Sequence, residues 1–239
     1  MPNVTLTATV VADGISQGRG YYLGLRQWET LCRHPRKSLM RHFSTGLGLA
    51  LGSLFLTGPV LALDQTAAEL VNQRCATCHG AQGQSSSPIF PSLAGQNLEY
   101  LVKQLHDFKT KKRVSDTMAP QVTDLSDANI SELATFFAGK PAKVNRVSDA
   151  DLLPVGRYIY TKGNSWSNVP ACTTCHGDKA YGTTTLPRLA GQNARYLLGQ
   201  LKDFNLRART NDNEAMHLVA SRLSELEAKA VTDYLSQLP

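Results

Sequence analysis

The fold is decided by the stretch Cys75-Ala76-Thr77-Cys78-His79-Gly80, which returns 97 residues later as Cys172-Thr173-Thr174-Cys175-His176-Gly177. In each copy two cysteines stand three positions apart, and a histidine follows at once. This spacing puts both thiols on one face of a helix, and CxxCH is the attachment signature of c-type haem. The motifs predict two covalent haem c groups, with the four cysteines as thioether links and His79 and His176 as proximal iron ligands.

Three other uses of paired cysteines compete with this interpretation. Zinc ribbons place their CxxC pairs about 15–20 residues apart, and the separation here is far larger. Thioredoxin-like redox pairs accompany a βαβ pattern, for which the chain offers no strands. A disulfide within each pair would leave both histidines without a role. Haem attachment is therefore the favoured hypothesis.

The rest of the chain is an internal repeat. Pro91-Ser92-Leu93-Ala94-Gly95-Gln96-Asn97 returns as Pro187-Arg188-Leu189-Ala190-Gly191-Gln192-Asn193. A nearly constant offset indicates two homologous domains, since solenoids have shorter periods and need more copies. We expect a first domain over residues 63–138, a Gly- and Pro-containing linker over 139–147 and a second domain over 148–239.

The hydrophobic periodicity predicts an all-α fold. Leucine and phenylalanine recur at helical spacing over 97–108 and again over 193–204. Ser126 and Ser224 are good N-cap residues for a last helix in each domain, and Ser224 with Glu227 predicts a capping box. Shorter helices are expected before each CxxCH motif, over 67–73 and 152–160.

The first 62 residues predict a targeting segment rather than a folded domain. A basic flank precedes a short apolar run that ends at Val60-Leu61-Ala62, which is typical of a secretory signal. We expect translation to start at Met40, residues 1–39 to be an extension, and cleavage to follow Ala62. An uncleaved membrane anchor over 43–63 remains the alternative. Export predicts a periplasmic protein.

The charge pattern argues against nucleic-acid binding. Most of the excess charge lies in residues 1–62, and residues 63–239 hold 19 basic and 17 acidic side chains. No basic stripe with interleaved aromatic residues is present. The run Lys109, Lys111, Lys112, Arg113 is typical of a solvated face, with contact to haem propionates or to an acidic partner as the alternative.

The sixth iron ligand is predicted to be a methionine in each domain. Met118 and Met216, one per repeat, are the only methionines after the signal region and follow the proximal histidines at nearly equal spacing. Two histidines compete for this role. His106 aligns with Lys202 and His217 with Ala119, so neither is repeated, and we favour the methionines. A carbonyl of the Pro91 or Pro187 loop could accept the histidine N–H, although an ordinary turn proline fits equally well.

With CxxCHG, PxLAGQN and the later methionine each present twice, the chain resembles the dihaem cytochromes of the cytochrome c4 type over residues 64–238. The resemblance implies two tandem class I cytochrome c domains, each wrapped around one haem with His/Met iron. It also implies a periplasmic carrier near the inner membrane that passes electrons toward terminal oxidases. The loop 161–171, with Trp166, departs from the first repeat.

Two closed iron sites predict an electron carrier rather than an enzyme, because no position is left for a substrate. The expected partners are redox proteins, namely a membrane-bound oxidoreductase and a terminal oxidase, with peripheral association to the membrane as a further expectation. A dihaem peroxidase also carries two CxxCH motifs and is the first alternative. A cytochrome subunit fixed to a larger oxidoreductase is the second.

Overall fold

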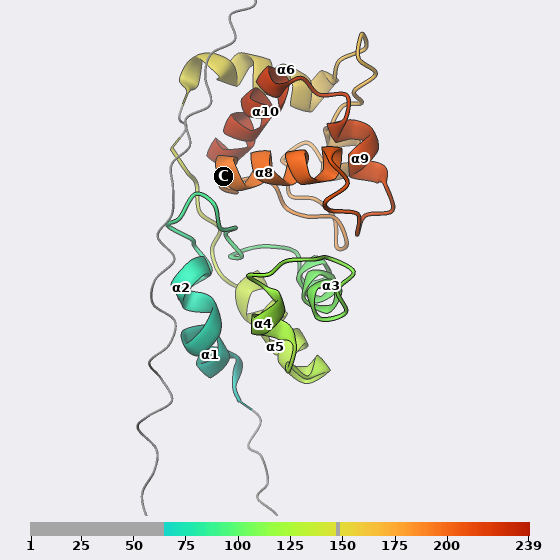
Figure 1. Ribbon diagram of the computed structural model, residues 1–239. Coiled ribbons are helices and arrows are strands. Elements are labelled where there is room, and N and C mark those ends of the chain that lie inside the picture. Colours follow the sequence, from blue (N-terminus) through green and yellow to red (C-terminus); the bar gives the residue numbers. More distant parts are fainter. Residues whose placement is uncertain (1–64, 147–148) are drawn as a thin grey trace, which may run out of the picture. The chain divides into compact units, whose positions relative to one another are not determined.

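The computed structural model describes residues 65–146 and 149–239, which belong to one compact unit, Pro59–Pro239. Helices joined by irregular loops make up this part of the chain (Figure 1). Its β-type pairing is confined to an isolated bridge between Asn164 and Val169. The predicted all-α class is confirmed. The expected start at Met40 and cleavage after Ala62 lie outside the described residues.

The first CxxCH motif ends a helix that changes its winding. α1 (Ala67–Leu70), the π-helical segment η1 (Val71–Cys75) and α2 (Ala76–His79) follow one another without a break. Gly80 ends the run at φ +78°, and a Cβ atom there would lie 2.7 Å from the Gln84 carbonyl oxygen. Only glycine tolerates this left-handed turn without strain.

The first domain is completed by three further helices, α3 (Leu98–Lys109), α4 (Ala119–Val122) and α5 (Asp127–Ala138). α5 packs against both α1 and α3. The buried residues form one apolar cluster: Leu70, Val71, Leu101, Val122, Leu125, Ile130, Leu133, Ala134 and Phe137. Burial of these side chains is the main force that holds the short helices, which would not be stable alone.

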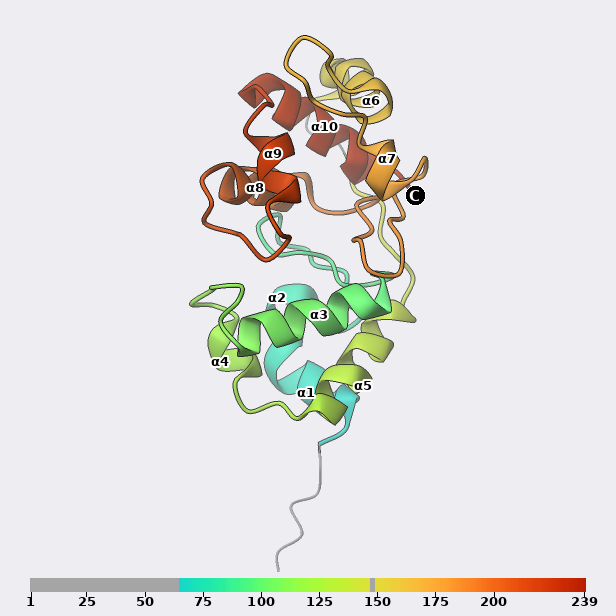
Figure 2. The ribbon, with the colours of Figure 1, turned by 90° about the vertical axis from the view of Figure 1, so that its right-hand side faces the viewer.

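The second domain repeats this plan. It contains a 3-10 turn and five helices: η2 (Ala150–Leu152), α6 (Leu153–Lys162), α7 (Thr173–His176), α8 (Ala194–Asn205), α9 (Ala215–Ala220) and α10 (Glu225–Gln237), all labelled in Figure 2 except η2. α10 packs against α6 and α8. The crossing with α6 is close, because a Cβ atom on Gly156 would lie 2.0 Å from the Ala230 carbonyl oxygen.

Both predicted caps are present. The Ser224 hydroxyl accepts from the Glu227 amide at 3.3 Å, and the Glu227 carboxylate accepts from the Ser224 amide at 2.8 Å. In the first domain Ser126 forms the same reciprocal pair with Asn129. Each cap satisfies amides that have no partner within the helix.

Over residues 139–146 the linker is irregular, as expected, and it is hydrogen-bonded to both domains. Lys143 Nζ donates to the Ser85 carbonyl at 3.1 Å, whereas the Asn145 side chain donates to the Gly191 carbonyl at 2.7 Å. The Asn145 amide also donates to the Ser236 carbonyl at 3.1 Å. The domain boundaries given above remain predictions.

No described helix has the length and apolar character needed to cross a membrane.

Candidate haem sites

The helices place the cysteines of each motif one turn apart beside a histidine. Cys75 ends η1, and α2 carries Cys78 and His79; Cys172 precedes α7, which carries Cys175 and His176. None of the four cysteines forms a disulfide. Within 65–146 and 149–239, no group of three or more His, Cys, Asp and Glu residues is arranged to hold a metal ion.

Burial keeps one thiol of each pair protonated. It raises the pKa of Cys75 to about 11 and that of Cys172 to about 11. Both cysteines pack against the apolar cluster of their own domain.

The two histidines are buried, with exposed fractions of 6% for His79 and 8% for His176. Nδ1 of His79 lies 2.8 Å from the Pro91 carbonyl oxygen, and Nδ1 of His176 lies 3.3 Å from that of Pro187. Because a carbonyl only accepts, Nδ1 carries the proton and Nε2 keeps its lone pair. Of the two interpretations of Pro91 and Pro187, the carbonyl that accepts from the histidine is therefore the one confirmed.

Burial also settles the charge of these imidazoles. It lowers the pKa of His79 and of His176, and the hydrogen bonds to Pro91 and Pro187 oppose the shift only in part. Both rings are neutral near pH 7, which is the form that binds iron. The donor set in each domain thus fits a haem held by two thioethers and one imidazole.

Tyr160 supports the second motif in a way that the sequence did not reveal. Its fully buried side chain donates from the hydroxyl to the carbonyl of Gly177, the residue after His176. Burial raises the pKa of Tyr160, so the phenol stays a donor. The sequence places a tyrosine in the helix before the motif, but only the fold shows that its hydroxyl reaches the Gly177 carbonyl.

The two predicted methionines occupy equivalent places, each at the start of a short helix. Met118 is the N-cap of α4, and Met216 lies in the first turn of α9. Polar side chains accept from their amides: Ser115 Oγ for Met118 at 3.2 Å, and Asp212 Oδ2 for Met216 at 2.5 Å. Met118 packs against the apolar cluster that Cys75 also touches.

The rival histidines make other contacts. Nδ1 of His217 lies 3.0 Å from the Phe204 carbonyl oxygen in α8. Nδ1 of His106 lies 4.0 Å from the Asp127 carboxylate, which is largely exposed. The contact of His217 resembles those of His79 and His176, because a proton on Nδ1 also leaves its Nε2 unprotonated. It therefore does not decide between His217 and Met216, and the methionine ligands stay a prediction.

The basic run beginning at Lys109 does not form a single face. Lys111 and Lys112 are exposed, but Arg113 turns inward and donates to Gln104 at 2.8 Å and to Gln200 of the second domain at 2.6 Å. Only part of this run is thus free to meet a partner.

Arg209 mirrors Arg113 across the domain boundary. It donates to Gln200 at 2.7 Å and to Gln104 at 3.1 Å. Each guanidinium also stacks over a phenylalanine of its own domain. The sequence shows both arginines, but it does not show that two glutamines are shared between them.

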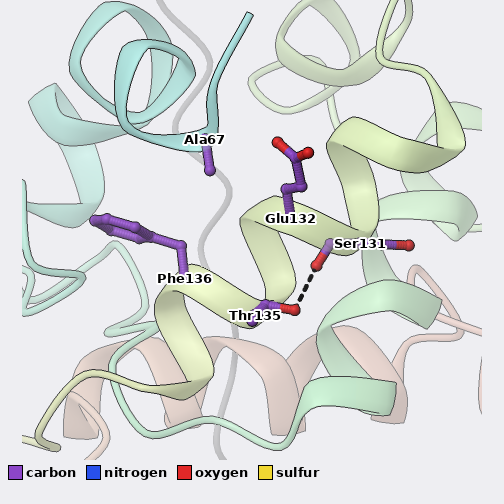
Figure 3. A pocket seen from close by; sticks show the side chains of 5 residues that line it. All are labelled: Ala67, Ser131, Glu132, Thr135 and Phe136. Atoms are coloured by element: carbon purple, nitrogen blue, oxygen red, sulfur yellow. Dashed lines mark hydrogen bonds between the residues drawn. The ribbon is translucent and has the colours of Figure 1, made fainter.

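Figure 3 shows a surface hollow that is separate from both motifs. Its lining residues are Ala67, Ser131, Glu132, Thr135 and Phe136, and the Thr135 hydroxyl donates to the Ser131 carbonyl at 2.8 Å. None of them is a predicted haem residue. The hollow offers neither thiol nor imidazole, so no redox role is assigned to it.

Comparisons with known proteins agree with two domains. Residues 62–137 match the family described as cytochrome C oxidase, cbb3-type, subunit III, and residues 156–239 match the family described as cytochrome c. The chain is 37% identical to cytochrome c4 of Pseudomonas aeruginosa over 204 residues, which cover 83% of this chain and 100% of that protein. The reduced cytochrome c4 of Pseudomonas stutzeri superposes with a TM-score of 0.69 at 33% identity, covering 72% of this chain and 97% of the other.

Other similar proteins carry names that mention thiosulfate dehydrogenase. The chain is 35% identical over 171 residues to the thiosulfate dehydrogenase electron acceptor of Stutzerimonas stutzeri, covering 69% of this chain and 78% of that protein. A solved thiosulfate dehydrogenase from Marichromatium purpuratum matches with a TM-score of 0.62 at 30% identity; the match covers 69% of this chain and 36% of that one.

Proposed function

The chain belongs to the cytochrome c4 family, and on this premise we propose that it carries single electrons in the periplasm from a membrane-bound oxidoreductase toward a terminal oxidase. Two cytochrome c domains and dihaem relatives give the protein two covalently bound haem c groups and the role of a dihaem electron carrier. The periplasmic site and the oxidase partner belong to the proposal.

Each domain would hold its haem with four side chains. Cys75 and Cys78 would form the thioethers of the first, with His79 and Met118 on the two sides of the iron. The corresponding residues of the second are Cys172, Cys175, His176 and Met216. The observation that carries this assignment is the neutral, buried histidine whose Nδ1–H is held by a proline carbonyl in both domains.

These residues explain why a carrier is favoured over a catalyst. The haem iron supplies one-electron oxidation and reduction. If histidine and methionine both hold the iron, no place would be left for oxygen or peroxide, and the methionine would raise the reduction potential. Cys75 and Cys172 pack against the apolar clusters that contain Leu101 and Leu197.

The second candidate is an electron acceptor for a thiosulfate-oxidising enzyme, bound to it either transiently or as a fixed subunit. Two relatives at 35% and 32% identity bear the name thiosulfate dehydrogenase electron acceptor. This candidate keeps the same haem ligands and changes only the electron donor.

Reduction and reoxidation of the purified holoprotein distinguish these functions. Reduced protein mixed with membranes containing a haem–copper oxidase should be reoxidised under air, and more slowly at high salt if exposed lysines such as Lys111 and Lys112 contact the partner. Rapid reduction by thiosulfate with purified thiosulfate dehydrogenase, without reoxidation by the membranes, favours the second candidate. Steady turnover of hydrogen peroxide with one high-spin haem would contradict both carriers.

A further inference from the structure

The PxLAGQN motif occurs twice. Of its residues, only the proline has a role at the haem sites described so far, because its carbonyl accepts from the proximal histidine. Its glutamine reaches across to the other domain in both copies. Oε1 of Gln192 accepts from the Ser92 amide at 2.8 Å, and its Nε2 donates to the Ser92 carbonyl at 2.8 Å. Gln96 does the same to Arg188, accepting from its amide at 2.7 Å and donating to its carbonyl at 2.9 Å.

These two-point contacts are buried and close-packed. Gln192, Ser92 and Gln96 are each 6–7% exposed. The residues around the two glutamines, Arg188 among them, enclose only about 10 Å³ of space, which is about the least that one water requires. Ser92 Oγ has no partner among the described residues, so Gln192 contacts the backbone of Ser92 and not its side chain.

The backbone that Gln192 contacts also binds the proximal histidine of the first domain. The amide N–H of Ser92 and the carbonyl of Pro91 belong to the same peptide unit, which is planar and rigid. His79 donates to the carbonyl end of this unit, and Gln192 of the second domain accepts from its N–H end. In the second domain His176 and Gln96 bind the two ends of the Pro187–Arg188 peptide in the same way.

Hydrogen bonds in such a chain strengthen one another, since accepting at one end polarises the group at the other. Within its own domain the loop is bonded on either side of this peptide: the Ser85 hydroxyl donates to the Cys78 carbonyl at 2.8 Å, and the Leu93 and Ala94 amides donate to the Gly83 carbonyl. From the second domain, Asn193 also donates to the Phe90 carbonyl at 2.7 Å. Gln192 is the side chain that binds the N–H of the Pro91–Ser92 peptide itself.

We propose that Gln192 and Gln96 are positioning residues that act across the domain boundary, each setting the histidine hydrogen bond, and hence the reduction potential, of the haem in the opposite domain. This inference rests on the proposed ligation by His79 and His176. A strong N–H···O=C bond makes the imidazole a better electron donor to iron, which favours the oxidised state. Loss of Gln192 should therefore raise the potential of the first haem, and loss of Gln96 that of the second.

The test uses the full dihaem protein and the pair Gln192→Leu and Gln96→Leu. Redox titration is followed through the hyperfine-shifted NMR signals of each haem, assigned by contacts to residues of its own domain. Gln192→Leu should raise the midpoint potential of the first haem alone, and solvent exchange of the His79 Nδ1 proton should become faster. Gln96→Leu should produce the mirror result.

A control separates this role from a general loosening of the interface. Tyr100→Phe removes a cross-domain bond, from Arg209 to the Tyr100 hydroxyl at 3.0 Å, without touching either proline peptide. It should shift neither haem selectively. If Gln192→Leu fails to fold, Gln192→Asn leaves room for water at the Ser92 amide and should give the same shift to a smaller extent.

The outcomes are distinct. A folded Gln192 variant whose shift falls on the second haem, on both haems equally or on neither would overturn the cross-domain role. If the wild-type spectra lack iron-bound imidazole signals from His79 and His176, the proposed ligation itself fails, irrespective of the glutamines.

Discussion

Gly191 lies so close to the linker that a Cβ atom on it would be 1.9 Å from the carbonyl oxygen of Lys143. Its φ of +73° is also one that other residues adopt only with strain. We expect Gly191→Ala to lower the free energy of unfolding by about 2–4 kcal/mol, from the clash and the left-handed backbone together. Denaturant unfolding of the holoprotein measures the effect.

Gly199→Ala is the matched control. Gly199 lies inside α8, and a Cβ atom there would have no neighbour within 4 Å. The equivalent position of the first domain is Lys103, so a side chain fits on this face. Alanine should stabilise this helix by about 0.5–1 kcal/mol. Equal destabilisation by both alanines would show that the linker contact is not the cause.

Haem attachment is tested by mass. Intact protein after denaturation should retain two haem additions, and replacement of Cys172 and Cys175 by serine should remove one of them. The reason is that thioethers survive unfolding, whereas axial ligation alone does not. A wild-type protein that contains zinc and no iron would refute the haem assignment.

Axial ligation is tested by removing one sulfur at a time. Met118→Leu and Met216→Leu should each abolish about half of the sulfur-to-iron charge-transfer band of the oxidised protein, since each domain supplies one methionine. His217→Ala is the control and should leave the band unchanged. The ligand assignment for the second haem is wrong if Met216→Leu keeps the full band while His217→Ala alters the spectrum.

A separate prediction concerns export of the protein and cleavage of its signal segment. It is based on the apolar run and the small residues before Leu63. N-terminal sequencing of the protein from the periplasm should find a chain that begins near Leu63. A chain that still begins at Met1 and sediments with membranes would refute both the cleavage and the Met40 start.

The sequence predicted the parts of the fold that depend on local pattern. Helices α3 and α8 begin and end within one residue of the expected 97–108 and 193–204, and α5 and α10 begin directly after the predicted caps Ser126 and Ser224. Periodicity and serine caps are local signals, which is why they could be predicted. α4 and α9 were not predicted, since helices of four and six residues show too little periodicity.

The candidate sites divide in the same way. The cysteines, histidines and methionines follow from spacing and repetition, and the proline carbonyls followed as an expectation. The cross-domain roles of Gln96, Gln192, Arg113 and Arg209 were not predictable. They depend on how two domains nearly 100 residues apart in sequence dock, and no local pattern encodes that contact.

The cap of α10 predicts a dependence of stability on pH. Burial alone would raise the pKa of Glu227, but hydrogen bonds from Ser224 and Asn164 hold it below its ordinary value of 4.5. A depressed carboxylate pKa stabilises the fold above pH 4.5, and this stabilisation is lost as pH falls through the folded-state pKa. Because solvent screens this site, we expect a contribution of about 0.5 kcal/mol.

Glu227→Gln should remove this part of the acid sensitivity, as measured by amide exchange in α10 between neutral and acid pH. Glu225→Gln, an exposed neighbour outside the capping box, is the control. An unchanged pH profile in Glu227→Gln would show that the carboxylate does not support the cap.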